Sequence, residues 1–262
     1  LFHKDDNIFI GKIFEFVTPA AILAKTTALA QAKQLPALDK RFKQDPATST
    51  VTFAKTFGWA AQVLGIQLPE LYLRNDVPGA LVTVPSRPVA SVAGNTVLTG
   101  FSPQELTFIV GKHLAHYRSE HYIKTLFPTL DELKVILFSA IKIVLPDFAV
   151  PENMAQAVAA TASTFVKYMQ PVERDSLRLV VNRFVEDGAR ADLKRWMQAT
   201  EVTAARAGLL LCADLDIAKK IIGAEQQLPG DLPPQEKMKE LLVFSVSEQY
   251  LALRKVLGIA VG

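Results

Sequence analysis

The chain has 262 residues, half of them hydrophobic, and its 29 basic and 26 acidic side chains give a formal net charge of +3. This length and hydrophobic content are sufficient for a large core. A net charge this small, with both signs mixed along the chain, indicates no nucleic-acid-binding surface. The single cysteine, Cys212, excludes an intrachain disulfide. It lies in an apolar run, so we expect a buried thiol and a reducing compartment such as the cytoplasm.

The first quarter of the chain is predicted to be mainly helical. Residues 8–35 have helical character, with Pro19 as a break or as the start of a second helix. Residues 36–49 are polar and predict a loop that contains a short helix. Residues 51–64 show an amphipathic helical pattern that ends at Gly65, a residue type that commonly terminates helices.

The pattern changes to short β-rich runs between residues 70 and 99. Proline, glycine and asparagine separate stretches that are rich in valine, leucine and threonine. Such runs predict a small sheet of three or four strands. The expected strands cover residues 71–74, 80–84, 88–92 and 96–98.

The second half of the chain is predicted to be helical. Its most apolar run, residues 135–145, is interrupted by Lys142 and stopped by Pro146, and it is shorter than the ~20 apolar residues that a membrane-spanning helix needs. No membrane span is therefore expected. The expected helices cover residues 129–145, 151–169, 171–188, 189–208 or beyond, 214–222 and 235–257.

A central helix between these two parts carries three of the four histidines. Its predicted start is Ser102, with Glu105 three residues later in the pattern of a capping box, and apolar residues recur at helical spacing as far as Tyr117. We expect the helix to continue through His121, and the side chains of Glu120 and His121 to be solvated. The three histidines are His113, His116 and His121.

The stretch that begins at Glu105 resembles the active-site helix of gluzincin metallopeptidases, especially the family of the CAAX prenyl endopeptidase and the heat-shock membrane protease. In that family a Glu-Leu pair precedes His-Glu-x-x-His, whose histidines bind zinc and whose glutamate activates the zinc-bound water. Aligned on Glu105 and Leu106, Lys112 takes the position of the first zinc histidine. His113 takes that of the catalytic glutamate, and only His116 coincides with a ligand.

The resemblance also implies a downstream helix with the pattern Glu-x-x-x-Asp, followed by Arg and Gly. In this chain Glu201 falls on the glutamate ligand, and Arg206 and Gly208 keep the later positions. Ala205 replaces the aspartate, which in the family orients a zinc ligand. Together with the two changes on the central helix, three functional positions therefore depart from the family pattern.

The resemblance implies an α+β, mostly α fold, with a small sheet next to the central helix and a helical C-terminal half. We expect one gluzincin-like domain over residues 1–262. Its parts are N-terminal helices at 1–69, the sheet and central helix at 70–122, and a helical part at 123–262 that carries Glu201.

The resemblance further implies a substrate groove. In such folds an edge strand of the sheet pairs with an extended peptide, and residues 79–84 resemble that strand loosely. The chain begins at Leu1 rather than Met, which suggests a fragment of a longer protein. The resemblance extends to similar degenerate domains of long bacterial proteins with helical repeats.

The altered positions predict a catalytically inactive domain that holds no cofactor. A protonated lysine is a poor zinc ligand near neutral pH, and a buried glutamate without its metal needs a counter-charge. We therefore expect Lys112 to form an ion pair with Glu201, with His116 as a further partner. Such a domain is expected to be structural, or to bind a peptide, a protein or other domains of a longer chain.

A zinc-dependent metallohydrolase is the alternative. In it His113, His116 and Glu201 bind a divalent ion in a rearranged site. Using His113 in place of Lys112 requires a rotation of the ligand face by ~100°, and Glu201 has to move as well. Outside the family frame, two histidines at i and i+3 on a half-polar helix are more often packing or surface residues than ligands.

Overall fold

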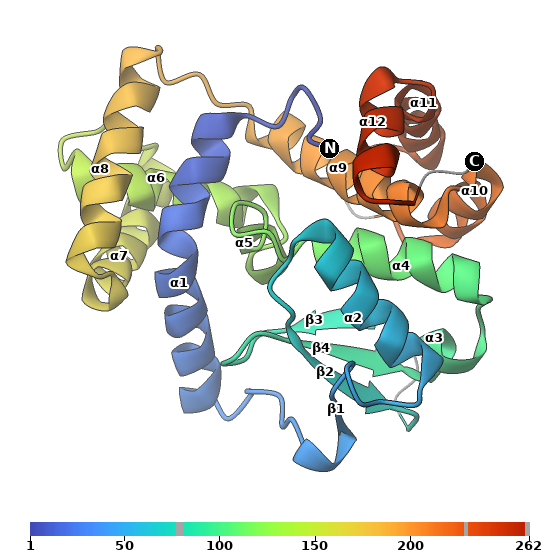
Figure 1. Cartoon of the computed structure of the whole chain (residues 1–262). Coiled ribbons are helices and arrows are strands. Elements are labelled where there is room, and N and C mark those ends of the chain that lie inside the picture. The colour runs from blue at the N-terminus through green and yellow to red at the C-terminus, as the bar shows by residue number, and fades with distance from the viewer. Residues whose placement is uncertain (77–80, 228–229, 260–262) are drawn as a thin grey trace.

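A small sheet and a large set of helices form the protein, which a computed structural model describes for residues 1–76, 81–227 and 230–259 (Figure 1). The fold is α+β and mostly helical, and the described residues form one four-stranded sheet of mixed direction. This confirms the α+β, mostly α part of the predicted fold class, while its gluzincin-like character stays a prediction.

The strand order is β1-β2-β4-β3, with β1 at Lys43–Gln44, β2 at Glu70–Arg74, β4 at Ala90–Gly94 and β3 at Leu81–Val84. Strands β2 and β4 are parallel, and the two outer pairs are antiparallel. Strand β3 therefore lies at an edge of the sheet, as the loosely matched segment 79–84 was expected to do, although residues 79 and 80 lie outside the described residues.

Three of the four predicted strands are confirmed, and the one predicted for residues 96–98 is wrong. Helix α3, at Asn95–Thr99, occupies that place. Thr99 Oγ1 donates to the carbonyl oxygen of Asn95, and Val97 is buried in the core under the sheet. A single helical turn thus buries the apolar side chain that suggested a strand. Strand β1 was not predicted, because two residues show no alternating pattern.

Helix α4, at Pro103–Ala115, starts as predicted and packs against α2, at Thr52–Leu64. The Ser102 hydroxyl accepts from the Glu105 N–H, and the Glu105 carboxylate accepts from the Ser102 N–H. Gly65 ends α2 in the left-handed conformation with φ of 63°, which confirms its predicted role. In Figure 1, α4 runs across the sheet with α2 beside it.

The predicted continuation of α4 through His121 is wrong. The N–H groups of His116 and Tyr117 bond to carbonyl groups three residues back, which tightens the last turn and ends the helix. The chain then turns, and only the short helix α5, at Ile123–Leu126, follows.

Helix α1, at Ile8–Gln31, belongs to a second group of helices, seen at the left of Figure 1. It is continuous through Pro19, so the predicted break or start at this residue is wrong. Proline removes one helical donor, but the helix buries Phe14 and Val17 before this point and Ala20 after it, and this packing keeps it continuous. Its partners are α6 at Leu130–Val144, α7 at Glu152–Tyr168 and α8 at Pro171–Glu186.

Helix α9, at Leu193–Cys212, joins the two groups and lies against α4. Glycines make this contact close: a Cβ on Gly208 would lie 2.7 Å from the carbonyl oxygen of Phe108, and one on Gly111 would lie 2.9 Å from Leu211 Cδ1. The sulfur of Cys212 is in the core at the end of α9, as predicted.

Three helices follow in the described part of the chain: α10 at Leu215–Ala224, α11 at Pro234–Ser245 and α12 at Glu248–Val256. The single helix predicted for residues 235–257 is wrong, because Ser247 interrupts it. The Ser247 hydroxyl accepts from the Tyr250 N–H and starts α12.

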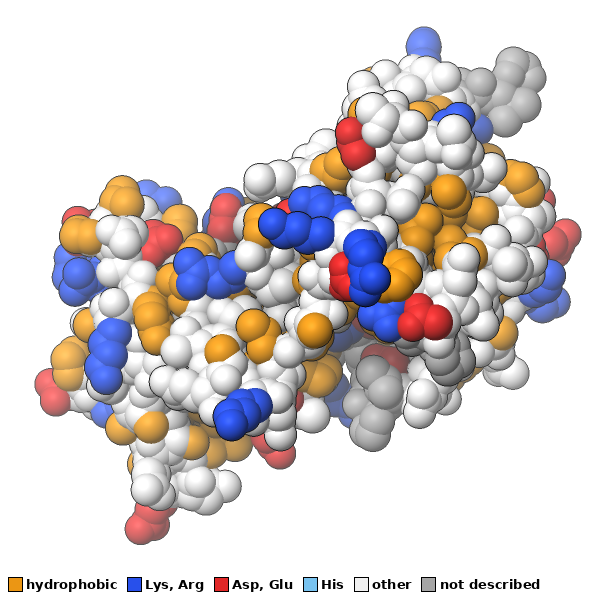
Figure 2. Space-filling model, turned by 90° about the horizontal axis from the view of Figure 1, so that it is seen from below, with side chains coloured by type: hydrophobic (Ala, Val, Ile, Leu, Met, Phe, Trp, Pro, Cys, Tyr) orange, Lys and Arg blue, Asp and Glu red, His pale blue; other side chains and the backbone are white. Residues whose placement is uncertain are grey.

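The surface carries charges of both signs. On the face in Figure 2, Lys and Arg side chains lie among acidic and hydrophobic ones. One 3-10 turn, η1 at Lys40–Phe42, is the short helix expected in the N-terminal loop. Nowhere in the described parts of the chain is there a helix with the length and apolar character needed to cross a membrane.

Candidate functional site

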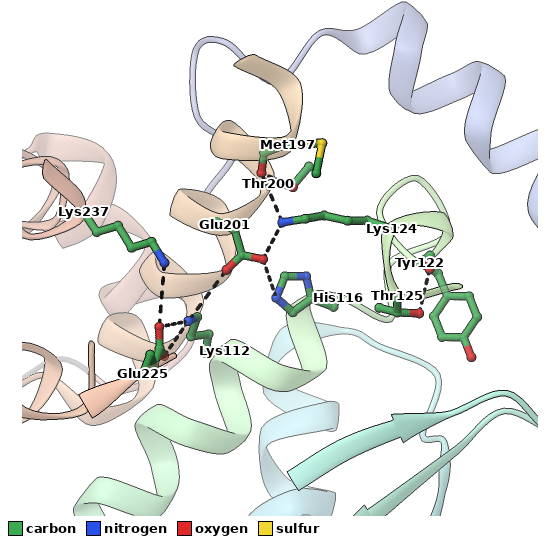
Figure 3. Close-up of polar contacts among 10 residues, drawn as sticks. All are labelled: Lys112, His116, Tyr122, Lys124, Thr125, Met197, Thr200, Glu201, Glu225 and Lys237. Atoms are coloured by element: carbon green, nitrogen blue, oxygen red, sulfur yellow. Dashed lines mark hydrogen bonds and ion pairs between the residues drawn. The ribbon is translucent and has the colours of Figure 1, made fainter. Parts of the chain in front are cut away.

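The carboxylate of Glu201 lies at the centre of a polar cluster between α4, α5 and α9 (Figure 3). Lys124 Nζ on α5 donates to Glu201 Oε1 at 2.5 Å. His116 Nε2, at the end of α4, lies 3.5 Å from the same oxygen, and Lys112 Nζ lies 3.7 Å from Oε2. The predicted ion pair of Lys112 with Glu201, with His116 beside it, is confirmed.

The closest partner of Lys112 is a different glutamate. Glu225 follows α10, and both of its carboxylate oxygens accept from Lys112 Nζ at 2.5 Å. Lys237 Nζ on α11 lies 3.8 Å from Glu225 Oε2. The cluster therefore extends from Lys124 through Glu201 and Lys112 to Glu225 and Lys237, as Figure 3 shows.

Burial and charge act against each other on these groups. Burial by itself raises the pKa of Glu201, but the positive charge nearby, first that of Lys124, holds this pKa well below its ordinary value. Burial by itself lowers the pKa of Lys112, but the negative charges of Glu201 and Glu225 have the larger effect. The pKa of Lys112 is therefore raised above its ordinary value. Glu201 is thus an anion and Lys112 a cation at neutral pH. Burial lowers the pKa of His116 to about 4.

His113 points to the sheet instead of to Glu201. The Tyr117 hydroxyl gives its proton to the carbonyl oxygen of Ala90 at 2.8 Å, so Ser91 Oγ donates to Tyr117 at 2.7 Å. Ser91 in turn accepts from His113 Nε2 at 2.8 Å. This chain of hydrogen bonds fixes the end of α4 to β4. Burial, and then His116, lower the pKa of His113 to about 3, so the imidazole is neutral.

Ala205, the other altered position, is completely buried in an apolar cluster that includes Phe108 and Leu209. Arg206, next to it, donates to the carbonyl oxygen of Phe2 and stacks on Phe244. The methyl group at position 205 therefore helps to pack α9, and it cannot orient a ligand as the aspartate of the family does.

The sequence did not indicate three residues of the cluster, and the predicted environment of a nearby histidine outside it was wrong. Lys124 and Glu225 gave no signal, because each lies far along the chain from its partner. Lys237 is on the next helix after Glu225 and shares no helical spacing with it. The expected solvation of His121 is wrong: it is 1% exposed, and its Nε2 bonds to Asp6 at 2.8 Å. The neighbouring side chain of Glu120 is 18% exposed and accepts from Arg118.

The side chains that meet here do not fit a zinc site as they stand. Structural and catalytic zinc sites use at least three protein ligands of the His, Cys, Asp or Glu type. Of the positions in the rearranged metal site, only His116 and Glu201 come together, while His113 bonds to Ser91. Across the described residues, no three such side chains are grouped closely enough to hold a metal ion.

A cleft of about 420 Å³ opens next to this cluster, between β3, α4 and the end of α10. Lys112, His113, His116 and Glu225 line its polar part. Its apolar part is formed by Leu81, Val97, Phe101, Ile109 and Ile221. The cleft therefore combines one edge strand, one apolar wall and one buried cation.

Comparison of the chain with models of protein families, with curated proteins and with solved structures found no match. The gluzincin resemblance therefore stays a prediction from the motifs around Glu105 and Glu201.

Proposed function

We propose that this protein is a catalytically inactive, metallopeptidase-like domain that holds a peptide or a segment of another protein in the cleft next to β3. The observation that carries the proposal is the cluster around Glu201. Where the motifs place zinc and its ligands, two lysines and a neutral histidine surround one glutamate. The lysines supply positive charge where a metal ion would supply it, but they lack the Lewis acidity of a metal.

The position of His113 supports the same conclusion. In a metallopeptidase the residue at this position removes a proton from the metal-bound water. Here the Nε2 proton of His113 is donated to Ser91, which is completely buried on β4. A side chain engaged in this way anchors a helix, and the nitrogen that donates to Ser91 cannot take a proton from a water molecule in the cleft.

The edge strand supports binding of an extended peptide. Strand β3 pairs only with β4 among the described strands, so the backbone groups on its other side are open to a further strand. Side chains alternate along the strand: Leu81 lines the cleft and Val82, 52% exposed, lies on the other face. A peptide added here would lie over the apolar wall.

A metallohydrolase that uses His113, His116 and Glu201 is the second candidate, favoured by the contact of His116 with Glu201. It requires His113 to leave Ser91 and both lysines to withdraw. Metal content, measured by mass spectrometry on protein purified without a histidine tag or chelator, separates the two. We expect no bound zinc in the wild type or in Glu201→Ala. One zinc per chain that is lost in Glu201→Ala would establish the metallohydrolase instead.

Peptide binding is tested with a fluorescent library of unstructured peptides and two variants on neighbouring positions of β3. We expect Leu81→Gln to weaken binding, because Leu81 lines the cleft. Val82→Gln should bind like the wild type, because its side chain is on the other face of the strand. Equal effects of the two substitutions on peptide affinity would refute a peptide site at β3. Absence of peptide binding by the wild type and both variants would refute it as well.

A further inference from the structure

Glu201 has a close partner of its own without Lys112. Lys124 Nζ is 2.5 Å from Glu201 and also donates to the carbonyl oxygen of Met197 at 3.3 Å, whereas Lys112 Nζ is 3.7 Å away. Lys112 is therefore directed mainly at Glu225, at the wall of the cleft. A buried lysine that faces a cleft is a binding group for an anion.

Glu225 forms its ion pair with Lys112 from a position just outside a helix. It directly follows α10, and its N–H donates to the carbonyl oxygen of Ile222 in the last turn. Its side chain is 26% exposed, compared with 14% for Lys112 and 14% for Glu201. A carboxylate at the edge of the cleft can move into water more easily than one inside the cluster, and Lys237 stays beside it.

The cation and the apolar wall belong to one cleft. Leu81 lines the cleft from β3, Ile221 from α10 and Lys112 from α4. At about 420 Å³ the cleft has room for one large side chain together with a carboxylate. In a peptide, the residue that carries both groups on the same Cα is the last one.

We propose that Lys112 binds the C-terminal carboxylate of a peptide whose last residue is large and apolar, and that Glu225 stands in for this carboxylate in the structure. The inference rests on the proposed peptide-binding function and specifies its ligand. The apolar side chain packs on the wall near Phe101 and Ile221, and the chain preceding it extends along β3. Glu225 is then a competitor built into the fold, which the ligand displaces.

The test compares two peptide libraries that vary the last residue and differ only in ending as a free acid or as an amide. Binding is measured by fluorescence anisotropy. For the wild type we expect acids with a final Phe, Leu or Ile to bind about tenfold more tightly than their amides, since a charge-assisted hydrogen bond is lost. A third library, amidated and with Glu before the last residue, shows whether a side-chain carboxylate can substitute.

Variants at the two partners give the sharpest outcome. Glu225→Gln removes the competing charge and should tighten binding of the acids several-fold without changing the amides. Lys112→Met should remove the difference between acid and amide. The matched control is Glu236→Gln, on α11, where a glutamate 49% exposed pairs with Lys239. It should bind both libraries like the wild type.

Failure of the C-terminal ligand and failure of the peptide site give different results. Equal binding of acids and amides by the wild type would overturn the role of Lys112 and leave the peptide site in place. If the third library bound more strongly than the free acids, Lys112 would be a binding group for an acidic side chain. The proposal of a C-terminal carboxylate as the ligand would then be overturned as well. Binding of no library would contradict both proposals. If Lys112→Met does not fold, an unchanged affinity of Glu225→Gln for the acids still refutes the inference.

Discussion

The negative charge of Glu201 is kept inside the protein by the nitrogen atoms around it. Its side chain is 14% exposed, and Lys124 provides the shortest contact. A buried carboxylate that loses its partner either protonates or costs several kcal/mol of stability. At the scale of single residues, Lys124 is therefore the side chain on which the stability of the cluster depends most.

Replacing this lysine should destabilise the protein. We expect Lys124→Met to lower the free energy of unfolding by about 3 kcal/mol, because it leaves Glu201 with one distant lysine and a neutral histidine. The double variant with Glu201→Gln should recover most of this loss, since the uncompensated charge is then gone. Urea unfolding at pH 7 measures both.

The control is Lys134→Met, whose partner Asp131 is 77% exposed. An exposed pair of this kind contributes roughly 0 to 1 kcal/mol, so little change is expected. A Lys124→Met protein as stable as Lys134→Met would show that Glu201 is adequately neutralised without Lys124.

The pH dependence of stability should reveal His113. Burial lowers the pKa of His113 from 6.5 to about 3, so the unfolded chain binds a proton below pH 6.5 while the folded chain does not. A depressed histidine pKa makes stability rise with pH between about 3 and 6.5 and fall on acidification. The groups that face His113 are Ser91, Tyr117, Phe57 and His116.

Between pH 7 and pH 5 the contribution of His113 falls by about 2 kcal/mol. His113→Gln keeps a side chain that can donate to Ser91 and removes the titration. We expect its stability to fall by that much less than the wild type over this range, measured by urea unfolding at both pH values. Parallel losses in the two proteins would mean that His113 titrates as it does in water.

At the scale of elements, the distance between α4 and α9 decides whether the cluster forms. Lys112 and His116 are on α4 and Glu201 is on α9, so their contacts depend on how closely the two helices approach. Gly208 permits that approach, because the backbone of Phe108 passes where a Cβ would lie.

Gly208→Ala should therefore separate the helices. A Cβ 2.7 Å from a backbone oxygen forces a shift, and overpacking of this kind costs roughly 1 to 3 kcal/mol. The control is Gly223→Ala on α10, where nothing lies within 4 Å of the added methyl group. There a gain of up to about 1 kcal/mol is expected from helix propensity. Thermal unfolding compares the two, and a neutral Gly208→Ala would show that α9 can move without loss.

At the scale of the whole molecule, α9 links the apolar cores. Trp196 and Met197 at its beginning belong to the core of the α1 group, while Leu209 and Leu210 pack with α10 and α11. Leu211 contributes to the core between α2, α4 and the sheet. Because one helix takes part in all three, they are expected to unfold together, as the predicted single domain requires.

The two tryptophans report on the two ends of the molecule. Trp196 is completely buried in the α1 group, and Trp59 is on α2. In Trp59→Phe and in Trp196→Phe, we expect the fluorescence of the remaining tryptophan to change at the same urea concentration as the far-ultraviolet circular dichroism. A fluorescence midpoint clearly separated from the dichroism midpoint in either variant would indicate two units that unfold independently.

The sequence predicted what depends on neighbours along the chain. The capping pattern of Ser102 and Glu105 predicted the start of α4, and Gly65 predicted the end of α2. The errors arose where distant contacts act: Pro19 is tolerated because the core holds α1 on both sides, and His121 is buried because Asp6 reaches it. A helix pattern in residues 235–257 could not show that Ser247 would start a new helix.

The sequence by itself determined most of the helices and most of the sheet, because spacing and caps are local features of the chain. The pairing of Lys112 with Glu201 was predicted from the gluzincin resemblance and from the need of a buried carboxylate for a counter-charge. Only the tertiary structure decided which lysine is closest to Glu201 and which glutamate occupies Lys112. Lys124 is 77 residues from Glu201, and Glu225 is 113 residues from Lys112. Contacts over such separations leave no periodic pattern in a sequence, since they exist only after the helices have packed.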